Sequence, residues 1–200
     1  ILSLLAVTEG EDQKDFTFNI YIGDALVFNW DKKISNFRGF DYIVGNPPYV
    51  RTKNLRVDVR ENIKKWNTGN FANTDLYIPF FELAVSWTKS SGRIGYITPS
   101  TYFTALNAKV LRGFLSEKKY IEKIIDFNGW QIFEGATTYT CITILNKKSC
   151  DTVQFALVDD LKKIKKLDEL SFSKALATSL SSEDWRLLSK KDAENILKIE

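Results

Sequence analysis

The sequence predicts an α/β fold, in which short buried strands alternate with helices. Short apolar runs recur along the first 150 positions, and stretches with helical spacing separate them. Of the 200 residues, 44% are hydrophobic and 26% are charged, which is typical of a globular chain. This length is enough for one domain with a substantial core.

Six segments are expected to be strands: residues 19–24, 40–45, 93–98, 121–127, 140–145 and 152–158. Tyr42-Ile43-Val44 is apolar at three successive positions, which indicates a strand covered on both faces. The polar, basic stretch 50–73 shows no sustained period, so we expect a long loop or an insertion there.

Two helices are expected between these strands, the first beginning near Thr74 and the second over residues 101–118. Thr74 is the predicted N-cap, and Asp75 follows in the first turn. Pro79 lies early enough to be absorbed by a shifted start or a kink, and Ser91-Gly92 is expected to end this helix.

The composition of the chain changes after Lys148, where segments rich in Lys, Asp, Glu and Ser begin. We therefore place a boundary near residue 150, which divides the chain into residues 1–150 and 151–200. Amphipathic helical pieces are expected around residues 161–170 and 190–199.

The composition excludes several classes of site. The chain has no histidine, so triads, acid–base chemistry and metal sites that need histidine cannot come from it. Its two cysteines, Cys141 and Cys150, are too few for a disulfide scaffold or a multi-cysteine zinc site, and we expect no metal. The net charge of +3 permits a nucleic-acid partner without arguing for one.

No apolar run is long enough to cross a bilayer, so we expect no membrane partner. The first seven residues are apolar apart from Ser3, but the run is too short and its flank too acidic for a secretory signal. There is no methionine, even at position 1, and we interpret the chain as a piece of a longer protein.

The tetrapeptide Asn46-Pro47-Pro48-Tyr49 directly follows the predicted strand 40–45. Its plainest interpretation is a rigid turn at a strand end. In open α/β sheets, however, ligands bind at the carboxyl ends of strands. Two prolines fix the backbone there, so that a carbonyl and an amide side chain can point the same way, and Tyr49 offers a flat face for stacking.

This corner has the right chemistry to hold an exocyclic amine. The Asn46 side-chain oxygen and the Pro47 carbonyl can each accept one of its protons, which draws the nitrogen toward tetrahedral geometry and aims its lone pair at an electrophilic methyl. No histidine base is needed, because the proton can leave after the methyl arrives. Catalysis would come from orientation and from preorganised dipoles.

Residues 40–50 resemble motif IV of the gamma-class N6-adenine DNA methyltransferases, and the type IIG restriction–modification enzymes most of all. The resemblance continues in order along the chain. Residues 20–26 are similar to motif III, 74–80 to motif V, 92–99 to the strand that follows it, and 132–145 to motif VIII. It covers about residues 15–148.

The resemblance implies roles for individual residues. Asn46, Pro47 and Pro48 form the catalytic corner with Tyr49, and Tyr49 and Phe133 stack on a flipped-out base, with Tyr139 as the second choice for Phe133. S-adenosylmethionine is the implied cofactor, held by Asp24, Ala25 and Phe80. Double-stranded DNA is the implied partner, contacted by Arg51, Lys53 and Arg56. Each assignment has a plain alternative: a turn cap for Asp24, core packing for Phe80, a loop anchor for Phe133 and a solvated face for the basic residues.

The resemblance also implies a partial, Rossmann-like methyltransferase sheet that lacks its N-terminal strands. None of the 10 glycines forms the Gly-x-Gly of a cofactor loop. Residues 1–150 would be the catalytic half of the domain, and 151–200 a linker toward a DNA-specificity domain. We expect the piece alone to bind cofactor weakly and to be inactive.

The sequence therefore predicts N6-adenine methylation of DNA in the bacterial cytoplasm, within a restriction–modification protein and with or without an attached endonuclease. Two alternatives stay open. The same corner serves enzymes that methylate glutamine amides in proteins or bases in RNA. The chain could also be a non-catalytic DNA-binding scaffold.

Overall fold

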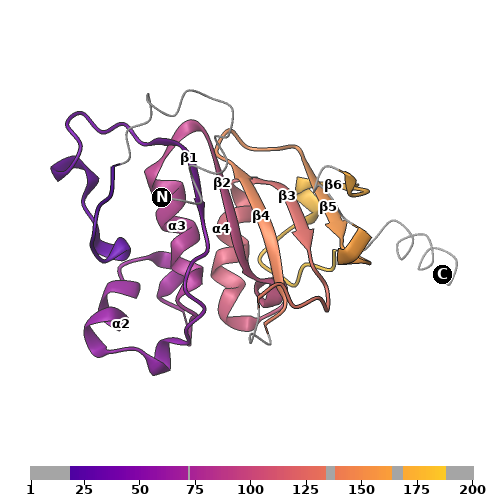
Figure 1. Ribbon diagram of the computed structural model, residues 1–200, viewed down its shortest axis with the longest axis horizontal. Helices are drawn as coiled ribbons and strands as arrows, with labels where there is room; N and C mark the ends of the chain where they lie inside the picture. The colour runs from indigo at the N-terminus through magenta and orange to yellow at the C-terminus, as the bar shows by residue number, and fades with distance from the viewer. Residues whose placement is uncertain (1–18, 72, 134–137, 164–168, 188–200) are drawn as a thin grey trace, which may run out of the picture.

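The computed structural model describes residues 19–71, 73–133, 138–163 and 169–187, which form a six-stranded mixed sheet flanked by helices (Figure 1). The strand order is β1-β2-β4-β3-β5-β6. β1 pairs in parallel with β2, and β3 with β5, whereas the other three neighbouring pairs are antiparallel. The strands are β1 (Phe40–Gly45), β2 (Thr88–Pro99), β3 (Ile121–Asp126), β4 (Thr140–Asn146), β5 (Thr152–Leu157) and β6 (Ser173–Leu176).

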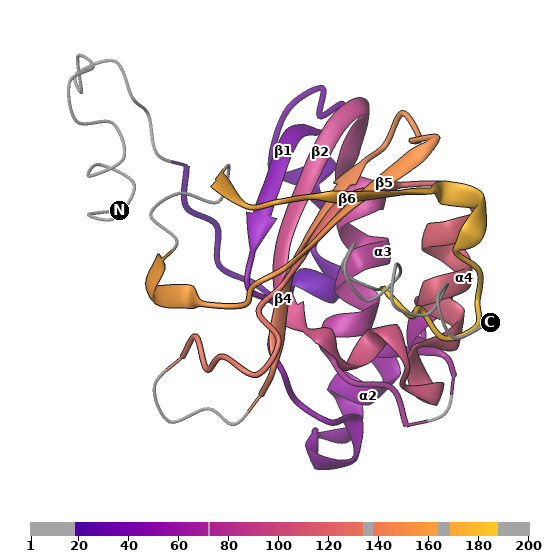
Figure 2. The ribbon, with the colours of Figure 1, turned by 90° about the vertical axis from the view of Figure 1, so that its right-hand side faces the viewer.

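Two helices, α3 (Tyr77–Trp87) and α4 (Lys109–Glu117), cover one face of this sheet (Figure 2). Their apolar side chains form the main core with inward-facing residues of the strands. Phe81 of α3, Leu111 of α4 and Ile94 of β2 are all fully buried in it. This layer confirms the predicted α/β class.

The opposite face is covered unevenly. Toward β3, a second cluster forms around Ile125, Phe127 and Val158. On β1, Ile43 packs against the main core, but Tyr42 is 72% exposed and Val44 is 82% exposed. The prediction that β1 is covered on both faces is therefore wrong for the described residues, because no described element packs on that side of it.

The first predicted strand is also wrong. Residues 19–22 form no ladder with a described strand, and a 3-10 turn, Ala25–Val27, follows them. Ile20 is 66% exposed and Ile22 is 96% exposed. An apolar alternation makes a strand only where a neighbouring strand supplies the hydrogen bonds.

The stretch 50–73 is more regular than expected, since it contains α2 (Val57–Ile63) and two 3-10 turns, Thr52–Asn54 and Asn67–Gly69. Leu76, not Thr74, occupies the N-cap position of α3. The Thr74 hydroxyl instead donates to the carbonyl of Phe71. Pro79 then falls in the first turn, where a missing N–H costs nothing.

α3 ends four residues earlier than predicted. Thr88 Oγ1 donates to the Ala84 carbonyl over 2.7 Å, and Lys147 Nζ donates to the carbonyls of Val85 and Thr88 over 2.7 and 2.5 Å. A cation at a helix C-terminus is favourable, and this one comes from a distant strand end, which the local sequence could not reveal. Ser91-Gly92 therefore lies inside β2, where the pairing register with β1 shifts.

The second predicted helix is shorter than expected: two 3-10 turns, Ser100–Phe103 and Leu106–Ala108, precede α4. Beyond the predicted boundary at residue 150, β5 and β6 extend the same sheet. The role of residues 151–200 as a linker stays a prediction. A 3-10 turn, Leu161–Lys163, begins the predicted helical piece, whereas residues 164–168 and the predicted helix 190–199 lie outside the described residues.

Within the described ranges, no helix combines the length and the apolar character that a bilayer crossing requires. The same residues contain no cluster of acidic or cysteine side chains suited to a metal ion.

Candidate functional site

The Asn46–Tyr49 corner lies at the carboxyl end of β1, beside the carboxyl end of the parallel strand β2 (Figure 1). Pro47 is buried, while Asn46 and Pro48 are exposed. The Asn46 side chain makes no hydrogen bond with a described residue. The buried Pro47 thus anchors the corner, and the Asn46 side-chain amide is free to accept or donate hydrogen bonds.

Tyr49 is fixed at both its hydroxyl and its ring. The hydroxyl donates to the backbone carbonyl of Ile97 on β2 over 3.0 Å. The ring lies edge-on to Tyr77 of α3, with centroids 6.3 Å apart and planes at 80°. Burial, with a smaller effect of Cys141, raises the pKa of Tyr49 to about 12. The side chain is therefore neutral at physiological pH, and it remains half-exposed.

The loop before β4 reaches the same edge of the sheet. Pro99 of β2 pairs with Thr140, and the Ser100 N–H donates to the Tyr139 carbonyl over 3.0 Å. The Tyr139 side chain is 53% exposed. Phe133 is half-buried earlier in this loop. Which of the two aromatic side chains faces a bound base stays a prediction.

The residues predicted to hold the cofactor lie at the turn Ala25–Val27 and on α3. Asp24 accepts the Leu26 N–H and the Asn62 amide, each over 3.0 Å, so it does cap the turn Ala25–Val27. Its carboxylate remains exposed and keeps further lone pairs. Leu26 and the half-buried Phe80 pack in one cluster with Val50, the residue after Tyr49.

The basic residues after the corner differ in their pairing. Arg56 forms a two-pronged ion pair with Asp58, at 3.1 and 3.2 Å. Arg51 bridges to Asp75 through its backbone. In the described part of the chain, Lys53 has no ion pair.

Tyr77 is a site neighbour that the sequence analysis missed. Its hydroxyl is fully buried and has no hydrogen-bond partner in hydrogen-bonding geometry among the described residues. Burial raises its pKa well above the usual range, and the nearby Thr101 side chain offsets this in part. In the sequence, Tyr77 matches the helical period of α3, so it cannot be distinguished there from ordinary core.

Comparisons with known proteins show the family and the fold of this chain. A family model described as "Eco57I restriction-modification methylase" matches residues 7–133. The type II restriction enzyme and methyltransferase RM.Eco57I of Escherichia coli is 35% identical over 198 residues, covering 90% of this chain and 20% of that protein. The type II methyltransferase M.HincII of Haemophilus influenzae is 29% identical, covering 82% of this chain and 33% of its own length.

Among solved structures, the type IIG restriction endonuclease BpuSI superposes with a TM-score of 0.62 at 17% identity. The match covers 88% of this chain and 24% of BpuSI. The likeness shows a shared fold. The chain spans between a fifth and a third of the length of these three proteins.

Proposed function

This chain belongs to the Eco57I restriction-modification methylase family, and we propose that it carries the catalytic corner of a DNA N6-adenine methyltransferase. One observation supports the proposal above all others. The exposed amide of Asn46 stands beside the buried Pro47, at the carboxyl end of a parallel strand pair, and no described residue uses its oxygen.

The proposed mechanism depends on two acceptors of this chain. The Asn46 side-chain oxygen and the Pro47 carbonyl accept the two protons of the adenine amino group, which is a poor nucleophile while its lone pair is delocalised. Pro47 and Pro48 fix the backbone, so the acceptors need no reorganisation when the base arrives. Preorganised dipoles of this kind contribute about 2.7–4 kcal/mol each in other enzymes.

Tyr49 supplies the stacking face for a base that has left the duplex. Flipping costs a few kcal/mol, and stacking on an aromatic ring returns about 1–3 kcal/mol. The hydrogen bond from Tyr49 to Ile97 holds the ring in place before the base binds. We propose Phe133, or Tyr139 after it, as the opposite face.

The residues near the corner fit S-adenosylmethionine. Asp24 offers an exposed carboxylate on a capped turn, Ala25 is half-buried in that turn, and Phe80 offers a half-buried ring in the cluster shared with Val50. We propose that these three hold the adenosine part. When bound, the cofactor supplies an electrophilic methyl carbon. Asp24 would then accept a hydrogen bond from the adenine amino group of the cofactor, and the Phe80 ring would pack on the cofactor.

The test is methyl transfer by the full-length protein with labelled S-adenosylmethionine and duplex DNA, followed by analysis of the nucleosides. We expect the label in N6-methyladenine. Label in protein or RNA with none in DNA adenine would favour the glutamine-amide or RNA alternative. A protein that shows no saturable cofactor binding would be the non-catalytic scaffold.

A further inference from the structure

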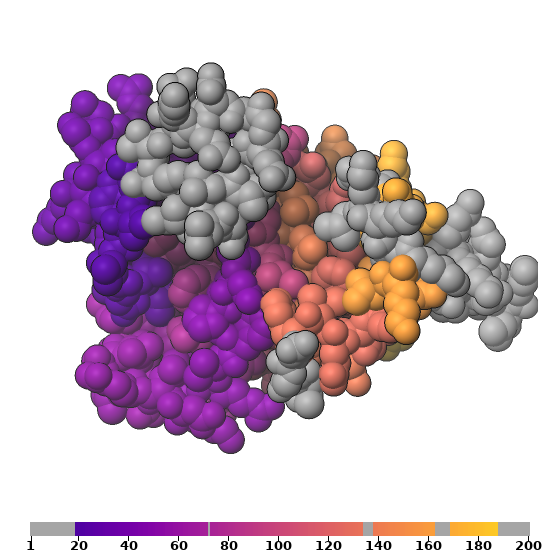
Figure 3. All heavy atoms as spheres, viewed as in Figure 1, coloured from indigo at the N-terminus to yellow at the C-terminus, as the bar shows by residue number. Residues whose placement is uncertain are grey.

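A polar cavity of about 440 Å³ opens within the segment that follows the catalytic corner. Its first lining residue, Thr52, comes three residues after Tyr49. Three residues span at most about 11 Å of extended chain, so the cavity lies close to the proposed base site. In the space-filling view, this part of the chain forms the lobe at the lower left (Figure 3).

The walls of the cavity are fixed to the core. Thr68 donates to the Glu82 carboxylate of α3 through both its N–H and its hydroxyl, each over 2.9 Å. Gly69 approaches Ile63 so closely that an added Cβ would lie 2.3 Å from the Ile63 carbonyl oxygen. Ile63 itself is 1% exposed. The Ile63–Gly69 side of the cavity is therefore held firmly against the core.

The charges around the cavity are unbalanced. Lys53, Arg60 and Lys64 line it, and Glu61 is the one carboxylate among the lining residues. Lys64 Nζ lies 2.8 Å from Glu61, so this carboxylate is already neutralised. Lys53 and Arg60 have no ion pair or side-chain hydrogen bond with any described residue. The lining residues thus carry three cations and one carboxylate, which leaves an excess of positive charge around the cavity.

We propose that Lys53 and Arg60 bind backbone phosphates of the DNA strand that carries the target base. This inference rests on the proposed function. One strand of duplex DNA rises about 3.4 Å per nucleotide, so 11 Å corresponds to about three nucleotides. The Thr52 end of the cavity therefore lies within about three nucleotides of the flipped adenine. Arg56, already paired with Asp58, contributes less than Arg60.

The experiment measures duplex DNA binding by the full-length protein as a function of salt concentration. Lys53→Gln and Arg60→Gln are each expected to make the negative slope of log K against log salt shallower by about 0.9, the value for one lost phosphate contact. Affinity should fall uniformly across DNA sequences, because phosphate contacts carry no sequence information. Arg56→Gln removes the same charge from a paired side chain and should change the slope by less.

Conservative variants separate binding from folding. Lys53→Arg and Arg60→Lys keep the charge and should restore the slope, whereas Lys118→Gln removes an exposed charge at the end of α4 as a control. The inference is overturned if both glutamine variants keep the wild-type slope while the wild type methylates DNA adenine. It is also overturned if the glutamine variants bind inorganic phosphate more weakly than the wild type but bind duplex DNA equally well. A wild type that methylates no DNA adenine refutes the proposed function instead.

Discussion

At the scale of single residues, Tyr49 performs two separable tasks, one through its hydroxyl and one through its ring. Tyr49→Phe removes the hydrogen bond to Ile97 and keeps the ring. It should lower the free energy of unfolding by about 1 kcal/mol, the usual value of one such bond. Urea unfolding measures this change.

Tyr49→Ala removes the stacking face as well. Stacking of about 1–3 kcal/mol per base then disappears, so methyl transfer at low DNA concentration should fall about 10- to 100-fold. Single-turnover methylation compares the two variants. If the phenylalanine variant loses as much transfer as the alanine variant, the hydroxyl matters more than the ring, and the stacking role is wrong.

Residues of the corner could be predicted from the sequence, because a short string of unusual residues carries the chemistry by itself. Asn46, Pro47 and Tyr49 lie at the strand end where they were expected. Their partners could not be predicted. The Ile97 carbonyl lies 48 positions away from Tyr49, and the buried Tyr77 hydroxyl looks like ordinary helix core in the sequence.

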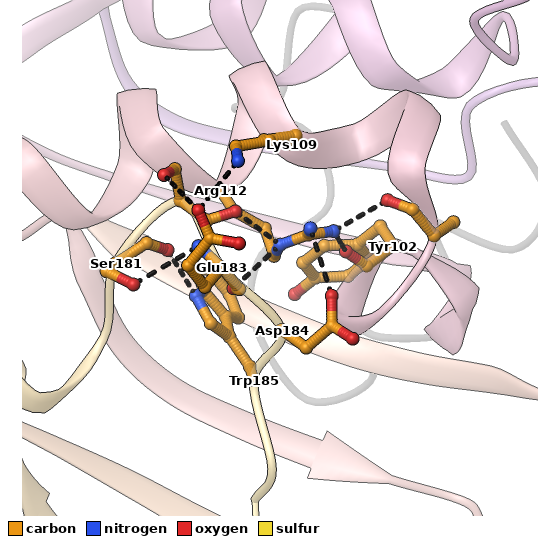
Figure 4. A network of polar contacts seen from close by, with 9 residues as sticks. Tyr102, Lys109, Arg112, Ser181, Glu183, Asp184 and Trp185 are labelled. Atoms are coloured by element: carbon orange, nitrogen blue, oxygen red, sulfur yellow. Dashed lines mark hydrogen bonds and ion pairs between the residues drawn. The ribbon is translucent and has the colours of Figure 1, made fainter.

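At the scale of elements, the segment after β6 is locked onto α4 by one buried side chain, Arg112 (Figure 4). Its Nε donates to the carbonyls of Ser182 and Glu183, over 3.0 and 2.9 Å. Its Nη1 donates to the carbonyls of Tyr102 and Ala105, over 2.9 and 2.7 Å. One guanidinium thus joins α4, the turn after β2 and the residues just before Trp185.

Arg112→Met should therefore destabilise the domain strongly. The variant leaves the carbonyls of Tyr102, Ser182 and Glu183 without a donor, whereas the Ala105 carbonyl keeps the Ala108 N–H. The loss of one partner of such a buried network costs about 3–5 kcal/mol. Lys109→Met is the matched control, since Lys109 lies on the same helix and its ion pair with Glu183 is largely exposed. Exposed pairs contribute about 0–1 kcal/mol.

Chemical unfolding of Arg112→Met and Lys109→Met measures the free energy that each variant loses. A loss that is equally small in both would mean that the Arg112 contacts contribute little and that the segment 181–187 is held by Trp185 packing alone.

Elements with strong periodicity were predictable, and those that depend on distant partners were not. β1, β3, β4 and β5 lie where the sequence predicts them, to within one residue. The end of α3 was wrong because Lys147, 60 positions after Trp87, helps to terminate it. The helix α2 was missed because its seven residues carry little apolar pattern.

At the scale of the whole molecule, the burial of uncharged tyrosine and cysteine side chains makes the free energy of unfolding fall at alkaline pH. Burial raises the pKa of Tyr49 and of the Cys141 thiol to about 12, and also raises those of Tyr77, Tyr96 and Tyr102. In the unfolded chain, a thiol titrates near pH 9 and a tyrosine near pH 10. The folded state therefore binds more protons than the unfolded state between these values and about pH 12.

The stability from these groups is fully present below about pH 8.5 and falls as the pH rises toward 12. Urea midpoints measured from neutral to alkaline pH should accordingly stay level and then decline above about pH 9. A midpoint that stays level up to about pH 11 would mean that these side chains are open to water in solution.

The proposed function requires Asn46 to act on the reacting amine and not to support the fold. Asn46→Ala in the full-length protein tests this most directly, with Asn54→Ala, an exposed asparagine of the same segment, as the control. We expect methyl transfer to fall about 100- to 1,000-fold, as for the loss of one preorganised group, with DNA affinity and unfolding unchanged. Retained transfer, or an equal loss of transfer and DNA affinity, would contradict the claim.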